Sequence, residues 1–153
     1  ESWRFLQGNG VAEGHLIGGC LEVVEFLRGA SLWPEPSSWD GAILFLETSE
    51  EAPPPRTLSR ALRSYAAMGI LEKISGLLLG RPGGGVPAEE FGRYEEALLE
   101  VVVEEEGLTR LPIITRMDFG HTDPMFVLPL GVKARIDCEN EQFEIPESGV
   151  TER

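Results

Sequence analysis

Residues 40–49 read DGAILFLETS, and no polar side chain interrupts their apolar run from Ala42 to Leu46. A strand with one solvated face alternates apolar and polar residues, whereas a continuous run indicates a strand in a sheet that is covered on both faces. The run ends at Glu47, and a Thr-Ser pair and a predicted helix follow it. Because α/β folds place functional groups where strands end, Glu47 is a candidate site residue, with capping or salt bridging as the alternative.

Segments typical of strands and helices alternate on either side of this strand. The helices are indicated by apolar side chains three and four residues apart, and two of them end at glycines, Gly29 and Gly69. The glycine-rich GNG at 8–10 predicts a tight connection between the first two strands. Expected strands cover 3–7, 14–17, 74–80 and 111–117, with two more inside 126–145 around the turn ENEQ, and expected helices cover 20–29, 49–69 and 93–107. This order predicts one α/β domain with a mixed sheet or small barrel flanked by helices.

Composition limits the classes of function. The 153 residues are 42% hydrophobic and 25% charged, which predicts a single domain, 1–153, with a hydrophobic core. A net charge of −13 argues against binding to nucleic acid or to an anionic membrane surface. The apolar runs are shorter than the ~20 residues of a membrane helix, and we see no signal peptide, so a cytoplasmic location is expected. Glu1 suggests a fragment whose natural N-terminus lies upstream.

The stretch RMDFGHTDPM, residues 116–125, contains His121, one of only two histidines. Glycine, proline and flanking aspartates predict a stiff loop directly after a strand. An imidazole there could be a general base, a metal ligand or an exposed loop residue. A glutamate that bonds one imidazole nitrogen leaves the other free to accept a proton, so Glu47 and His121 together suggest the orienting residue and the base of a catalytic triad.

The nucleophile of such a triad is not evident. No GxSxG elbow occurs, and Ser31, Ser37, Ser38 and Ser49 lie in predicted loops or caps. Cys20 is a weak candidate, because the start of a helix could lower the pKa of its thiol; helix packing is the alternative. Cys20 and Cys138 are expected to be reduced, and two cysteines with two histidines match no standard zinc spacing. His15, inside an apolar strand pattern, is expected to be a packing residue.

Two further groups have alternative interpretations. Trp3, Trp33 and Trp39 could pack in the core or an interface, or could stack on a substrate ring. Asp118, His121 and Asp123 could together hold a cation weakly, as in a metal-dependent hydrolase.

Four segments taken in order resemble one family. GHLIGGCLEVVEFLRGA, DGAILFLETSEE, ISGLLLGRP and DFGHTDPMFVLPLGVKARID are similar to the C-terminal domain of the S66 serine peptidases, which include LD-carboxypeptidases and microcin C self-immunity proteins. The resemblance covers about Trp3 to Ile145 and is closer to the microcin-immunity branch. The chain departs from the family at Cys20, where asparagine is frequent.

The resemblance implies an α/β domain of the swivelling β/β/α type and an active site whose residues come from two domains. Glu47 and His121 match the family's catalytic glutamate and histidine, while the serine and the oxyanion hole belong to an N-terminal domain that this chain lacks. The implied reaction is hydrolysis of a peptide-like amide without a cofactor or metal, in an aminoacyl-nucleotide or, alternatively, a murein tetrapeptide. Trp3, Trp39 and Thr122 are the expected substrate contacts, and the partners are the protein's own N-terminal domain and a second copy in a homodimer. A non-catalytic binding or dimerisation module is the alternative of another class.

Overall fold

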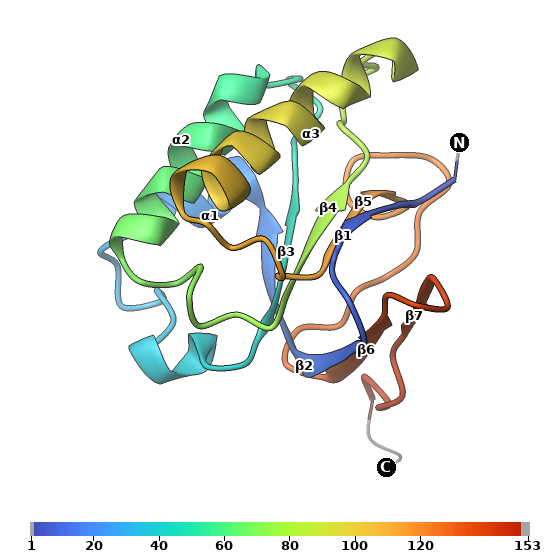
Figure 1. Cartoon of the computed structure of the whole chain (residues 1–153). Coiled ribbons are helices and arrows are strands. Elements are labelled where there is room, and N and C mark those ends of the chain that lie inside the picture. The colour runs from blue at the N-terminus through green and yellow to red at the C-terminus, as the bar shows by residue number, and fades with distance from the viewer. Residues whose placement is uncertain (1, 151–153) are drawn as a thin grey trace.

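A computed structural model of the chain describes residues 2–150, and their centre is a mixed sheet that curls into a half-barrel (Figure 1). The spatial order of its seven strands is β1-β5-β4-β3-β2-β6-β7. β2 to β5 form a parallel centre, while β1 at one edge and β6 with β7 at the other pair antiparallel. The strands are β1 (Arg4–Gln7), β2 (Val11–Cys20), β3 (Ile43–Glu47), β4 (Gly76–Gly80), β5 (Ile113–Met117), β6 (Lys133–Asp137) and β7 (Gln142–Glu144). The expected α/β domain with a mixed sheet is confirmed.

The helices lie together against one face of this sheet (Figure 1). They are α1 (Leu21–Phe26), α2 (Pro55–Ala67) and α3 (Phe91–Leu99), with a π-helical segment at Glu100–Glu105 and 3-10 turns at Pro36–Trp39 and Ala88–Glu90. None of the helices in residues 2–150 is long and apolar enough to cross a membrane.

Each face of β3 has its own hydrophobic core, as its continuous apolar run predicts. Leu44 and Leu46 pack with the helices, whereas Ile43 and Phe45 belong to the core on the opposite face. That second core is covered by the long segment between β5 and β6, drawn in orange in Figure 1, which contributes Phe119 and Phe126. Because side chains alternate along a strand, Glu47 continues the face of Ile43 and Phe45 and points toward this segment.

The first two strands differ from the expectation. They do not pair with each other: β1 pairs with β5, and β2 lies on the other side of the sheet. β2 is also longer than the predicted 14–17, because its first half pairs with β6 and its second half with β3. The predicted tight connection at 8–10 is therefore a change of direction, with positive φ at Gly8 and Gly10, and not a hairpin.

All three helices differ from their predicted bounds. The first was expected over 20–29 but is only the six residues of α1, and Gly29 lies beyond it with a φ of +81°. The helix expected over 49–69 begins later, at Pro55, and ends at Ala67. The third was expected to run regularly over 93–107, but it starts at Phe91 and becomes π-helical from Glu100. Acidic residues at 104–106 oppose the helix macrodipole at this C-terminal end, which is consistent with the change in winding.

Candidate active site

Glu47 is fixed at the carboxyl edge of the parallel strands. It is the last residue of β3, and only 6% of its surface is exposed. The next residue, Thr48, is also buried, and its hydroxyl accepts a hydrogen bond from the backbone N–H of Gly83 at 3.0 Å. The backbone of Glu47 pairs with Cys20 of β2, and the next residue is bonded to the segment after β4. The sheet, and not a mobile loop, therefore sets the position of the Glu47 carboxylate.

His121 reaches Glu47 from the segment that follows β5. This segment is tied to the sheet at Asp118, whose carboxylate accepts hydrogen bonds from the Trp3 indole N–H at 2.8 Å and pairs with Arg81 at 2.8 Å. One residue later, the Phe119 ring meets the Phe45 ring edge-on, with centroids 5.9 Å apart. These contacts bring the chain back over the face on which Glu47 lies.

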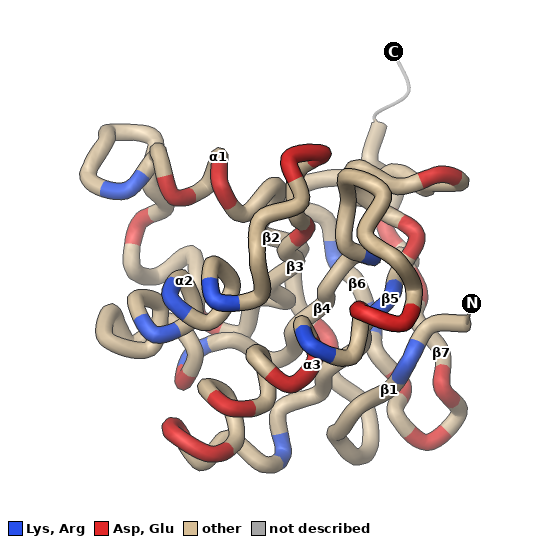
Figure 2. Tube along the Cα trace, turned by 90° about the horizontal axis from the view of Figure 1, so that it is seen from above, with Lys and Arg blue, Asp and Glu red and all other residues tan. Residues whose placement is uncertain are grey.

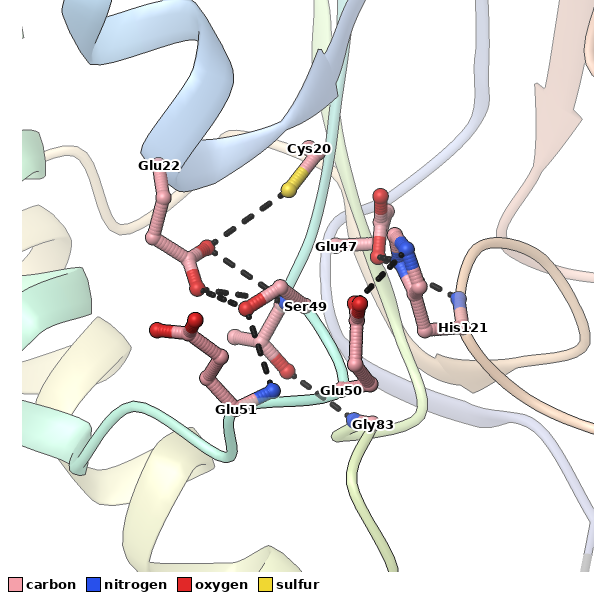
Figure 3. Close-up of polar contacts among 9 residues, drawn as sticks. Cys20, Glu22, Glu47, Ser49, Glu50, Glu51, Gly83 and His121 are labelled. Atoms are coloured by element: carbon pink, nitrogen blue, oxygen red, sulfur yellow. Dashed lines mark hydrogen bonds and ion pairs between the residues drawn. The ribbon is translucent and has the colours of Figure 1, made fainter.

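The two side chains are in direct contact. His121 Nδ1 lies 2.8 Å from Glu47 Oε2, and the backbone N–H of His121 donates to the same oxygen at 3.3 Å (Figure 3). The hydrogen bond to Glu47, together with the negative charges of Glu47, Glu50 and Glu22, raises the pKa of His121 above its ordinary 6.5. The carboxylate thus fixes the ring orientation and stabilises the imidazolium, which is what an orienting residue does for a general base.

Two glycines make this approach sterically feasible. Gly120 has a φ of +87°, and a Cβ there would lie 2.6 Å or less from three atoms of Glu47. A Cβ on Gly83 would meet the carbonyl oxygens of Thr48 and Ser49 at 2.6 and 2.8 Å and His121 Cβ at 2.9 Å. The loop can therefore close onto Glu47 only where these side chains are absent.

The other imidazole nitrogen faces outward. His121 Nε2 lies 3.1 Å from Glu50 Oε2, and the side chains of His121 and Glu50 are 40% and 72% exposed. Acidic positions are spread over the whole chain (Figure 2), and three of them, Glu22, Glu47 and Glu50, gather around this ring. An exposed carboxylate can swing aside, so Nε2 is accessible to an incoming group.

Cys20 lies beside this pair but lacks the properties of a nucleophile. It is the last residue of β2 and stands opposite Glu47 in the parallel register. Burial, together with the charges of Glu47 and Glu22, raises the pKa of its thiol to about 11. The start of α1 does act to lower this pKa, through the backbone N–H groups of Val23 and Glu22, but burial and the two carboxylates outweigh it, so the thiol is not activated.

Of the other predicted residues, Trp3 and Thr122 lie near the Glu47–His121 pair, whereas Trp39 and His15 do not. Trp3 and Thr122 are half-buried at the same edge, Trp3 through its bond to Asp118 and Thr122 next to His121. Trp39 is buried, with its ring 5.7 Å from that of Trp33, and it precedes β3, at the end of the strand opposite to Glu47. His15 packs as expected, with its Nε2 2.6 Å from the Ser38 carbonyl oxygen.

The alternative cation site is not formed. Asp118 is engaged by Arg81 and Trp3, and within residues 2–150 the only group of three or more metal-binding side chains whose ligand atoms converge is Cys20, Glu47 and His121. Sequence reasoning missed Glu22, Glu50 and the glycine contacts. Of these, only Gly120 could be noticed in the sequence, as the glycine directly before His121.

Comparison with known proteins identifies relatives of this chain. Residues 13–136 match the family described as LD-carboxypeptidase C-terminal domain. The chain is 33% identical over 140 residues to the microcin C7 self-immunity protein MccF of Escherichia coli, covering 92% of this chain and 38% of that protein. It is 29% identical over 144 residues to a probable murein peptide carboxypeptidase of Bacillus subtilis, covering 94% and 42%.

A solved structure has the same fold. An MccF-like protein from Streptococcus pneumoniae, crystallised in complex with AMP, superposes with a TM-score of 0.77 at 32% identity, covering 95% of this chain and 45% of that one. The chain thus spans about two-fifths of the length of the relatives it matches.

Proposed function

This chain belongs to the LD-carboxypeptidase C-terminal domain family, and we propose that it supplies the base and the orienting carboxylate of a serine-type amide hydrolase. The observation that carries the proposal is the 2.8 Å contact between His121 Nδ1 and Glu47 Oε2 at the carboxyl edge of the sheet. We propose that the nucleophilic serine and the oxyanion hole come from an N-terminal domain. Support comes from the relatives, of which the chain covers only 38% and 42%, and from His121 Nε2, which within residues 2–150 is paired with Glu50 and not with a serine.

The proposed reaction uses both imidazole nitrogens. The serine hydroxyl attacks the amide carbonyl carbon while His121 Nε2 takes its proton, and Glu47 stabilises the imidazolium through Nδ1. The same proton then passes to the leaving amine nitrogen as the C–N bond breaks and the acyl-enzyme forms. Water, deprotonated by His121, hydrolyses the acyl-enzyme and regenerates the serine. Glu50 must leave Nε2 for the serine to enter, which its exposure allows.

We propose an aminoacyl-nucleotide amide as the substrate, as in microcin C immunity. Support comes from the similarity to the Escherichia coli self-immunity protein and from the AMP bound to the Streptococcus pneumoniae relative. Trp3 and Thr122, at the same edge as His121, are the proposed substrate contacts, and Trp39 is left out because it is buried elsewhere. The second candidate substrate is a murein tetrapeptide, because a probable murein peptide carboxypeptidase is also similar.

The two substrates can be separated by one comparison. The full-length enzyme should cleave an aminoacyl-sulfamoyl adenosine with a higher kcat/KM than a murein tetrapeptide. The opposite order would assign the protein to cell-wall recycling. Cleavage of neither by a folded full-length protein would favour the non-catalytic binding module.

The 153-residue chain alone should hydrolyse neither substrate, because Cys20 carries a proton at neutral pH and no serine faces Nε2. Product release by the purified chain, measured by chromatography, is therefore expected to equal the buffer blank. Robust turnover that disappears in Cys20→Ala but persists in Cys138→Ala would instead identify a cysteine nucleophile.

The rate of the full-length enzyme should fall at acidic pH. A general base must be neutral, so kcat/KM is lost as pH falls through the pKa of His121, which Glu47 raises above 6.5. Glu47→Gln removes the charge that raises this pKa, so the acidic limb should move to lower pH while the maximal rate decreases. A pH–rate profile of both proteins tests this, and an acidic limb that moves upward in Glu47→Gln would contradict it.

A further inference from the structure

The structure brings a thiol, a carboxylate and an imidazole together from three separate segments. Cys20 ends β2, Glu47 ends β3, and His121 comes from the segment after β5. One ligand atom from each lies within 4.8 Å of the other two. We propose that Cys20, Glu47 and His121 form a binding site for a zinc ion, which is independent of whether the full-length protein is a hydrolase.

The spacing is close to that of a zinc site. Zinc–ligand bonds of about 2.0–2.3 Å in tetrahedral geometry place pairs of ligand atoms roughly 3.3–3.6 Å apart. His121 Nδ1 and Glu47 Oε2 are 2.8 Å apart, so these two atoms must move apart slightly to bind zinc. The Cys20 sulfur lies within 4.8 Å of the other two ligand atoms, so it must move closer to them by at most about 1 Å or slightly more. The parallel register between Cys20 and Glu47 holds the two strand ends side by side, so side-chain rotation is enough to close the site.

The groups around the three ligands also suit a bound zinc ion. If Nδ1 binds zinc, the imidazole proton is on Nε2, where Glu50 lies at 3.1 Å to accept it; this carboxylate–histidine–zinc arrangement is frequent in zinc proteins. Zinc displaces the thiol proton to solvent, and the charges of Glu22 and Glu47 that disfavour a thiolate also attract a dication. His121 is 40% exposed, so water can take the fourth position.

The ligand set selects zinc over the common hard cations. Magnesium and calcium take oxygen ligands, whereas thiolate with imidazole is the combination that suits zinc. Zinc would occupy Nδ1 and the Glu47 carboxylate, the same atoms that orient the proposed base. Binding of zinc and function of the triad are therefore mutually exclusive, and zinc should act as an inhibitor of the full-length enzyme.

Cobalt titration of the 153-residue chain provides the direct test, because a cobalt–thiolate bond gives a near-ultraviolet charge-transfer band. We expect one cobalt per chain with this band, displaced by one equivalent of zinc. Cys20→Ser should abolish the band and weaken zinc binding at least about tenfold in a chelator competition. Cys138→Ser is the matched control, because Cys138 is also a half-buried thiol with a raised pKa, and it should leave both measurements unchanged.

Three results would overturn the site: no zinc binding by the folded chain, equal zinc affinity in the wild type and Cys20→Ser, or loss of the band in Cys138→Ser. If Cys20→Ser proved unfolded in a thermal melt, the band in the wild type and in Cys138→Ser would still assign the thiolate. These measurements involve no substrate, so failure of the zinc site and failure of the hydrolase proposal are distinguishable.

Discussion

Replacement of His121 by alanine in the full-length enzyme should lower kcat by about 10⁴-fold and leave a residual rate from binding and the oxyanion hole. The reason is that the serine proton then has no acceptor at the position of Nε2. The folded state should lose only on the order of 1 kcal/mol, the cost of leaving the buried Glu47 carboxylate with fewer partners. Steady-state kinetics and a thermal melt on the same preparations measure both effects.

Two variants serve as controls. His15→Ala removes the other histidine, whose Nε2 bonds to the Ser38 carbonyl oxygen near the end of β3 opposite to Glu47. This variant should keep kcat near the wild-type value. Glu47→Gln should lose less than His121→Ala, because an amide still fills the space and can accept a bond from Nδ1–H. A folded His121→Ala enzyme with near-normal kcat would show that His121 is a structural loop residue.

The pairing of Glu47 with His121 could be anticipated because both depend on local sequence. The apolar run of β3 shows where a buried strand ends, and glycine and proline around His121 indicate a stiff loop after another strand. The parallel strands of a sheet have their carboxyl ends at one edge, so the exits of β3 and β5, with only β4 between them, lie at the same edge. The local sequence does not show on which face of the sheet the segment that carries His121 lies.

Interactions between distant segments explain the parts that were not predicted. The long β2 exists because two different neighbours pair with its two halves, and neither neighbour is visible in the sequence of β2 itself. The place of Cys20 before a helix suggested an activated thiol, with helix packing as the alternative. Its actual environment is set by Glu47 across the strand pair and by burial, which act in the opposite direction to a helix start.

Gly120→Ala in the full-length enzyme should reduce kcat by about 10²-fold or more, since a displacement of about 1 Å in a catalytic group can have this effect. The added Cβ would lie 2.5–2.6 Å from Glu47 Cγ, Cβ and Oε2. Glu47 is buried and is fixed by its strand, so the loop carrying His121 must retreat. Steady-state kinetics measures the loss, and the histidine resonances of the 153-residue chain should report a weaker interaction with Glu47 through a lower pKa of His121.

The comparison with Gly107→Ala separates this collision from simple backbone strain. Gly107 also has a positive φ, +68°, but a Cβ there meets nothing within 4 Å, and the residue lies at the end of the π-helical segment. Both variants therefore carry the strain of an alanine in the left-handed region, about 1–2 kcal/mol, and both should melt at lower temperatures, with Gly120→Ala the lower of the two because its collision with Glu47 adds to this strain. Only Gly120→Ala should lose activity beyond that, because only there does the methyl group push against the orienting carboxylate. Equal kcat in the two variants would mean that the close approach of Gly120 to Glu47 does not position the base.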